Sequence, residues 1–148
     1  MSGVEDLDRR ILTLLAADGR MSFTDLGKAT GLSTSAVHQR VKRLESRGAI
    51  KTYAAVLDYD AIDLPITAFI SIRPIDASQP DDSPERLRDV PEIESCWSVA
   101  GDMSYILKVR VATPRDLEDL LSRVRAAAHV STRTTIVLST PYEGRPVA

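Results

Sequence analysis

The sequence is poor in the features that mark secreted and membrane proteins. It has a single cysteine, Cys96, which cannot form a disulfide within the chain and fits a reducing compartment. Its longest apolar run, residues 11–17, is far too short to span a bilayer. The N-terminus is acidic at Glu5 and Asp6, where a secretory signal would be basic. We therefore expect a cytoplasmic protein without a membrane partner.

The sequence also lacks the common short motifs of catalytic and cofactor sites. It contains no glycine-rich nucleotide loop, no His-Glu-x-x-His and no Cys-x-x-Cys. Its two histidines, His38 and His129, fall in different parts of the chain, which argues against a histidine-centred catalytic cluster. Cys96 stands beside Trp97 in a strand-like stretch, which favours an inert core residue, with a redox switch as the alternative. We expect no enzymatic activity, no metal and no cofactor.

Charge is unevenly divided along the chain, although the net charge of all 148 residues is only −2. Residues 1–56 hold nine Lys or Arg and six Asp or Glu, a net charge of +3. Residues 57–148 hold ten and fifteen, a net charge of −5. This asymmetry favours a basic module joined to an acidic one, with a merely solvated charged face as the alternative.

The first thirty residues show the periodicity of two helices. The apolar stripe of the first helix, expected over about residues 5–17, consists of Leu7, Ile11, Leu14 and Leu15. The stretch that follows resembles a capping box, with Ser22 as N-cap and Asp25 as the acidic residue three positions later. The helix that it opens is short and stops at Gly31.

A third helix follows after a very short turn. Ser33 is a second N-cap candidate, and Val37, Val41 and Leu44 then recur on one face until Gly48, a suitable residue just beyond a helix end. A short helix, a tight turn and a longer helix make the layout of a helix-turn-helix, in which the second of the two helices enters the major groove of DNA.

The face of this third helix opposite its apolar stripe is polar and basic. Small residues at its start allow close approach to base edges, and Gln39 has the geometry to pair with adenine. Helix-start amides suit a phosphate, and the basic residues further along suit the DNA backbone. The expected DNA-binding residues are Ser33, Thr34, Ser35, His38, Gln39, Lys42, Arg43 and Arg47. The alternative is a helical module that only packs against protein.

The pattern after residue 48 alternates between strands and helices. We expect strands over residues 49–56 (a wing or linking strand), 66–72, 93–100, 105–112 and 132–140, and helices over residues 84–90 and behind a cap at Thr113. Residues 58–64 read as a linker and residues 74–84 as a loop. The order after the linker is that of a ferredoxin-like βαββαβ sandwich, which leaves one sheet face uncovered. With Phe69, Trp97 and Val109 as candidates for that face, a homodimer is expected to cover it.

Five spaced motifs together resemble the Lrp/AsnC (feast/famine) family of prokaryotic regulators, and the resemblance continues through the whole chain. The motifs are Leu7–Leu12, Ser22–Leu26, Gly31–Ser33, Val41–Glu45 and Gly48–Ile50. The resemblance implies that the helix over residues 33–47 enters the major groove and that the strand over residues 50–57 pairs subunits. It also implies that dimers join into larger even-numbered assemblies, often octamers.

The stretch from Val99 to Leu107 resembles the effector loop of this family, where an amino acid binds between subunits. Gly101 permits close backbone approach and Asp102 can hold an ammonium group, whereas Ser104 stands where the family usually has an acid. The alternative is a tight turn that needs Gly-Asp only for its backbone. The candidate effector-binding residues are Gly101, Asp102, Met103, Ser104, Tyr105, Thr134 and Thr135, although two threonines in a strand also serve as plain strand formers.

The sequence thus predicts an α+β protein of two modules. A winged helix-turn-helix domain over residues 1–57 is followed by a linker over residues 58–64 and a ferredoxin-like oligomerisation and effector-binding domain over residues 65–148. The predicted function is sequence-specific binding of double-stranded DNA in transcription regulation, modulated by an amino acid or related metabolite. The alternative is an oligomeric metabolite-binding module whose helical domain contacts protein.

Overall fold

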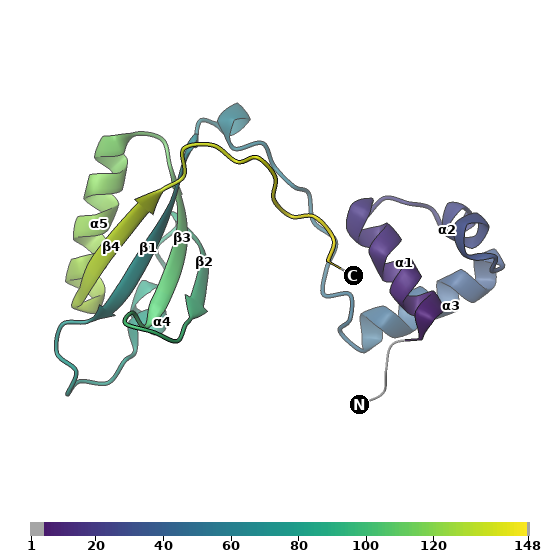
Figure 1. The fold of residues 1–148 in the computed structure, drawn as a ribbon, viewed down its shortest axis with the longest axis horizontal. Coiled ribbons are helices and arrows are strands. Elements are labelled where there is room, and N and C mark those ends of the chain that lie inside the picture. Colours follow the sequence, from purple (N-terminus) through teal and green to yellow (C-terminus); the bar gives the residue numbers. More distant parts are fainter. Residues whose placement is uncertain (1–4, 148) are drawn as a thin grey trace. The chain divides into compact units, whose positions relative to one another are not determined.

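Residues 5–147 are described by the computed structural model, and contacts within the chain divide it into two units (Figure 1). The helical unit takes in the chain as far as Val56, together with the residues from Pro141 onward. The sheet unit is Leu57–Thr140. No helix among residues 5–147 is both long enough and apolar enough to cross a bilayer.

The helical unit contains α1 (Asp6–Ala17), α2 (Phe23–Thr30) and α3 (Thr34–Ser46), which confirms the three predicted helices. Both predicted N-caps form: the hydroxyl of Ser22 accepts the Asp25 N–H at 3.0 Å, and that of Ser33 accepts the Ala36 N–H at 3.2 Å. The buried core of the unit consists of Ile11, Leu15, Leu26, Val37, Val41 and Leu44.

The turn between α2 and α3 brings the backbone of α2 unusually close to the chain that leaves it. Gly31 ends α2 at φ 77°, and both Gly31 and Leu32 donate their N–H groups to the Gly27 carbonyl, at 2.8 and 3.1 Å. A Cβ atom at Gly27 would lie 2.6 Å from the carbonyl oxygen of Leu32. A side chain at residue 27 therefore cannot fit unless the backbone of the turn moves.

The strand expected over residues 49–56 does not form within this chain, so the prediction of a wing is wrong for the single subunit. Residues 51–58 are neither helix nor strand, and the next regular element is a 3₁₀ turn, η1 (Asp60–Ile62). A strand needs a neighbour to pair its backbone N–H and C=O groups, and no other strand of the described chain runs beside this segment. One side chain of the segment is anchored, since the Tyr53 hydroxyl donates to Glu45 Oε1 at 3.0 Å.

The sheet unit has the predicted ferredoxin-like order. Its elements are β1 (Ile66–Pro74), α4 (Ser83–Leu87), β2 (Ile93–Ser98), β3 (Tyr105–Val111), α5 (Pro114–Ala128) and β4 (Val130–Ile136). The four strands form one antiparallel sheet in the order β2-β3-β1-β4. At the start of α5, the Thr113 hydroxyl accepts the Asp116 N–H at 3.1 Å, as the predicted cap requires.

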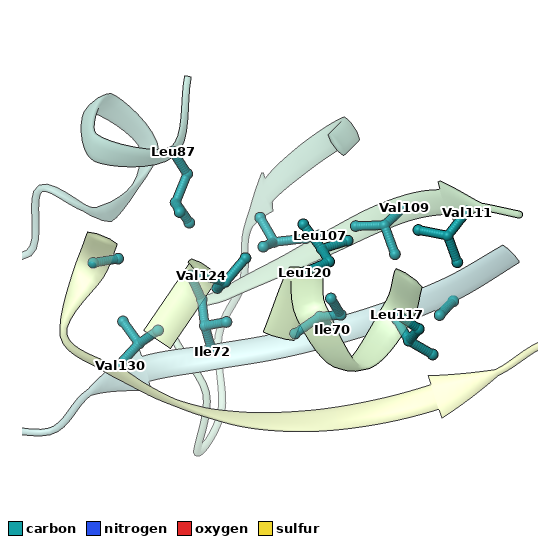
Figure 2. Close-up of a cluster of buried hydrophobic side chains, with 12 residues drawn as sticks. Ile70, Ile72, Leu87, Leu107, Val109, Val111, Leu117, Leu120, Val124 and Val130 are labelled. Carbon is teal, nitrogen blue, oxygen red and sulfur yellow. The ribbon is translucent and has the colours of Figure 1, made fainter. Parts of the chain in front are cut away.

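The core of this unit lies between α5 and one face of the sheet. Figure 2 shows Leu117, Leu120 and Val124 of α5 pointing toward the alternate residues of β1 and β3 that line this face. Val109 is among them and is fully buried, so its expected place on the open face is wrong. Because side chains alternate along a strand, Val109 shares the core face with Leu107, its second neighbour.

Two element boundaries differ from expectation. Helix α4 begins at Ser83 and ends at Leu87, earlier than the predicted Val90. Strand β4 begins at Val130 and ends at Ile136, whereas the prediction ran from residue 132 to residue 140. Ile136 is the last paired residue of β4, opposite Ala68, and the Val137 N–H still donates to the Thr67 carbonyl of β1 at 2.9 Å.

Replacing Gly27 by alanine tests the tight turn. Alanine favours a helix over glycine by about 1 kcal/mol, yet we expect Gly27→Ala to lower the free energy of unfolding of the helical unit by about 1–3 kcal/mol through steric clash. Amide hydrogen exchange in α2 and α3 measures the effect. Gly19→Ala is the control, because a Cβ there would meet nothing nearer than the Leu15 carbonyl oxygen at 3.8 Å. Equal protection in the two variants would contradict this explanation of the turn.

Candidate nucleic-acid interface and effector loop

The predicted DNA-binding residues lie together on the solvent side of α3 and at its two ends. Val37, Val41 and Leu44 hold the opposite side of the helix against the core. All eight predicted residues are exposed: Ser33, Thr34, Ser35, His38, Gln39, Lys42, Arg43 and Arg47. A shallow hollow on this face is lined by Gln39, Lys42, Arg43 and Ser46. The face therefore carries an amide, cations and small hydroxyl residues that nothing in the helical unit covers.

The start of α3 has the features of a phosphate site. Ser33 caps the helix, and its hydroxyl lies 3.3 Å from that of Ser35. Backbone N–H groups in the first turn of a helix have no acceptor within it, and the helix dipole places partial positive charge there. The start of α3 can thus bind a phosphate while Lys42 and Arg43 provide full positive charges about two turns further along.

His38 is held by a contact that sequence reasoning did not predict. Its ring lies against that of Phe23 in α2, with the centroids 5.2 Å apart and the planes inclined by 39°. The residue as a whole remains exposed. The contact therefore limits the orientations open to this exposed ring.

Arg40 does not belong to the exposed face, although it lies in the same helix. Its Nη1 donates to Glu5 Oε2 at 2.8 Å and to Asp8 Oδ1 at 2.9 Å, both in the first part of α1 or just before it. The hydrogen bonds that Arg40 donates to Glu5 and then to Asp8 raise the pKa of its guanidinium above the ordinary value. Arg40 contributes to the basic count of residues 1–56, but its charge is directed inward.

The hairpin between β2 and β3 is held by backbone hydrogen bonds. The Val99 N–H donates to the Ser104 carbonyl at 3.0 Å, and the Ser104 N–H donates to the Ile72 carbonyl at 2.9 Å. Gly101 has φ 128°, in the region that side-chain-bearing residues avoid, and both Gly101 and Asp102 are exposed. Gly101 is thus required by the backbone of the turn, while the Asp102 carboxylate is free of that role.

The rest of the predicted effector set is more dispersed. Met103, Ser104 and Tyr105 are half-buried at the start of β3, where burial and then the charges of Asp81 and Glu85 raise the pKa of the Tyr105 hydroxyl. Thr134 and Thr135 lie in β4, on the far side of β1 from the hairpin. Thr134 pairs with Ile70 of the core face and Thr135 with Phe69 of the open face, so the two threonines point to opposite sides of the sheet. They do not line one pocket within this chain.

The open face of the sheet carries an aromatic pair. Phe69 and Trp97 stack with their centroids 6.5 Å apart and their planes inclined by 26°, and Trp97 is 46% exposed. Both were predicted for this face. Cys96, its neighbour in edge strand β2, is exposed, so the prediction of a core cysteine is wrong. Partial burial of the thiol and then the charge of Glu85 raise the pKa of Cys96, which keeps the thiol protonated at neutral pH.

The open face also carries charged residues, of which Lys108 lies opposite Phe69 in the neighbouring strand. Lys108 Nζ and Arg110 Nε each lie 3.4 Å from Glu94 Oε2. The Arg110 guanidinium also lies over the ring of Tyr59 at 3.6 Å and donates to Thr67 Oγ1 at 2.9 Å. Arg110 thereby fastens the segment after residue 56 to the sheet.

Both halves of the chain match known domains. The AsnC-type helix-turn-helix domain matches residues 5–45, and the Lrp/AsnC ligand binding domain matches residues 67–147. The chain belongs to the Lrp/AsnC family of transcriptional regulators. The resemblance expected from the five motifs is thereby confirmed.

Relatives in this family are similar over nearly their whole length. The HTH-type transcriptional regulator LrpA of Mycobacterium tuberculosis is 51% identical over 142 residues, which cover 96% of this chain and 95% of LrpA. The leucine-responsive regulatory protein of Haemophilus influenzae is 34% identical over 140 residues, 91% of this chain and 84% of that protein. The feast or famine regulatory protein of M. tuberculosis, complexed with L-methionine, has a structure with a TM-score of 0.94 at 51% identity, covering 97% of this chain and 98% of that one.

Membership of the Lrp/AsnC family is consistent with the two-part architecture but does not assign roles to individual side chains. Sequence reasoning placed the exposed face of α3 correctly and missed the contacts of His38, Arg40 and Arg110. For Arg40 a signal was present. It stands three residues after Val37 and four before Leu44, which is the spacing of the core stripe. For Arg110 and its ring partner Tyr59, fifty-one positions apart, no local pattern pointed to contact.

Proposed function

We propose that the chain is a sequence-specific DNA-binding regulator of transcription that works as an assembly of subunits and responds to an amino acid or related metabolite. Residues 1–57 bind double-stranded DNA, and residues 65–148 assemble subunits and bind the effector. Residues 58–64 link these two domains. Because its target is DNA, the protein works in the cytoplasm. It catalyses no reaction. The observation that carries it is the uncovered polar and basic face of α3, held outward by its buried opposite side.

Within that face, different residues serve different parts of DNA recognition. Gln39 and His38 reach toward base edges, where an amide can pair with adenine through two hydrogen bonds. Lys42, Arg43 and Arg47, together with the capped start of α3 at Ser33–Ser35, contact phosphates. Base contacts determine sequence preference, whereas phosphate contacts supply affinity that depends on salt.

The salt dependence of binding tests this division of roles, on an operator obtained by selection from random DNA. If a dimer neutralises about six phosphates, log affinity against log salt should have a slope near −5. Lys42→Ala changes both subunits and should reduce the slope by about 2. Gln39→Ala should leave the slope unchanged and relax sequence preference, at a cost of about 1–3 kcal/mol per base contact.

Asp25→Ala is a control, because it removes a charge from α2 without touching the exposed face of α3. Equal losses of specific and non-specific binding in Lys42→Ala and Gln39→Ala would show that the reading face is misassigned. Absence of binding to any DNA would overturn the regulator proposal and favour a helical domain that contacts protein.

The proposed assembly rests on two uncovered surfaces. The open face of the sheet exposes Trp97 beside Phe69. Because helices cover only the other face, a partner on this face would remove its apolar surface from water. The extended segment 51–58 has strand-like composition but no strand partner in the described chain, and it exposes Tyr53, Val56 and Leu57. A second copy, pairing this segment and covering the sheet, satisfies both. Larger even-numbered assemblies, such as octamers, follow if the dimers join further.

A single substitution on the open face should weaken the assembly. Trp97→Ser removes the exposed ring from both subunits of a two-fold interface, at a cost of about 2 kcal/mol or more for each anchor. Sedimentation velocity of the full chain at micromolar concentration should show a smaller species than the parent. Ile75→Ser is the control, since Ile75 is 72% exposed but lies beyond the end of the sheet pairing. A Trp97→Ser variant that sediments like the parent would contradict the proposed interface.

The effector is proposed to bind at the β2–β3 hairpin. The exposed carboxylate of Asp102 beside the uncluttered backbone of Gly101 suits the ammonium group of an amino acid. A similar protein is described as complexed with L-methionine, which makes L-methionine the first ligand to test. Thr134 and Thr135 point to opposite sheet faces, so at most one of them from each subunit lines a given pocket. That threonine would meet the β2–β3 hairpin of another subunit, at the interface between the two.

Asp102→Ala tests the effector proposal. Isothermal calorimetry with L-methionine and the other common amino acids should detect binding to the parent, and the effector should change DNA affinity by about 5- to 150-fold. Asp102→Ala should abolish that response while leaving effector-free DNA binding intact. The matched control Asp89→Ala, an exposed acid of the same unit outside the hairpin, should respond like the parent. No heat with any of the twenty, together with unchanged DNA binding, would mean that this member lacks amino-acid control.

A further inference from the structure

Arg40 differs from the other basic residues of α3 in where its charge lies. Lys42 and Arg43 are exposed, whereas the Arg40 side chain is only 20% exposed. Its Nη1 lies between two carboxylates, 2.8 Å from Glu5 Oε2 and 2.9 Å from Asp8 Oδ1. Asp8 is 9% exposed and Glu5 is 70% exposed. The inner half of the cluster is therefore a largely buried ion pair, and the outer half is a surface contact.

The two halves of this cluster differ in energetic importance. An exposed ion pair such as that with Glu5 contributes little. Removing one partner of a buried pair is costly, because the other charge is left without compensation. Asp8 lies three residues before Ile11 in α1, and Arg40 lies between Val37 and Leu44 in α3. The Asp8–Arg40 pair thus sits at the rim of the contact between these helices.

The position of the pair matters because a polar contact adds direction to the rotation of α3 that apolar packing sets. Val37, Val41 and Leu44 make apolar contacts, which have little directional preference. A helix with its side chains is about 10–12 Å across, so a rotation of about 20° moves side-chain ends by about 2 Å. Hydrogen bonds to bases tolerate only a few tenths of an ångström. A directional contact that resists such a rotation therefore serves base recognition more than phosphate attraction.

We propose that Arg40 is a positioning residue, which with Asp8 fixes the rotation of α3 on α1 so that Gln39 and His38 meet base edges, and that Arg40 itself does not touch DNA. This inference rests on the proposed function, because it concerns how that function reaches sequence specificity. It separates the basic residues of α3 into two roles that their charge alone does not distinguish.

The sign of the effect at Asp8 distinguishes positioning from phosphate contact. If Arg40 bound a phosphate, Asp8→Ala would remove a competing acid, strengthen DNA binding and steepen the salt slope. If Arg40 positions α3, Asp8→Ala should weaken operator binding even though it removes a negative charge. Alanine is the best helix former, so the substitution does not weaken α1 through helix propensity. Asp6→Ala is the matched control: it removes the same charge from the same helical turn, away from Arg40.

The experiment measures operator and non-specific affinity across a salt series for the parent, Asp8→Ala, Arg40→Leu, the double variant and Lys42→Ala. Arg40→Leu and Asp8→Ala should each lower the ratio of specific to non-specific affinity by about tenfold, with the double variant no worse than either single one, as expected for a coupled pair. Their salt slopes should match that of the parent, whereas Lys42→Ala should lose about 2. A merely destabilised domain would lower specific and non-specific binding together and leave the ratio unchanged.

Several outcomes overturn the inference. A slope reduced by about 2 in Arg40→Leu, with tighter binding by Asp8→Ala, would make Arg40 a phosphate contact. An unchanged specificity ratio in both single variants would make the pair irrelevant to recognition. If Arg40→Leu does not fold, Asp8→Ala and the double variant still decide between these results. If the parent binds its operator and the variants bind with the same specificity ratio, this inference alone is overturned. If the parent binds no DNA, the proposed function is overturned.

Discussion

The contact between the apolar side of α3 and the rest of the helical unit determines what that unit can present to solvent. Val37, Val41 and Leu44 are buried against Ile11 and Leu26, and this orientation turns the polar side of the helix outward. The close approach of Gly27 to the Leu32 carbonyl sets the short path by which α3 leaves α2. Every candidate DNA contact depends on these two features, because they set which side of α3 faces solvent.

A packing contact of this kind turns one side of a helix inward, and polar contacts add direction to it. The Asp8–Arg40 ion pair adds direction at the rim of the core, and the ring contact of His38 with Phe23 adds it on the α2 side. Both link α3 to a different helix. The polar face is thus supported from two sides, by Arg40 at the rim of the core and by His38 on the face itself, an arrangement suited to a site that must match base geometry.

The sheet unit follows a different constraint, since its two helices cover only one face of four strands. The core face is filled by alternate residues of β1 and β3 against α5 (Figure 2). The open face instead holds the Phe69–Trp97 stack and the cluster in which Arg110 contacts Glu94, Thr67 and Tyr59. An exposed indole in such a setting is typical of an interface, whereas a monomer would leave it in contact with water.

Much of this architecture could be predicted from the sequence because short-range patterns determine it. The serine caps of α2 and α3, the threonine cap of α5 and the period of the apolar stripes all act within one or two turns, and each of them was confirmed. The order of strands and helices then limited the sheet unit to one familiar topology. The exposed residues of α3 followed from the same periodicity.

What the tertiary structure alone decided involves partners far apart in the chain. Pairing register placed Val109 beside Ala68 in the core and Thr134 beside Ile70, since register depends on how strands from distant segments align. Residues 51–58 form no strand because no strand of the described chain pairs with them. The partner of Arg40 lies more than thirty positions away, at Asp8. Local sequence determines which elements form and which side of each is apolar, whereas the partners of charged and strand residues depend on three-dimensional packing.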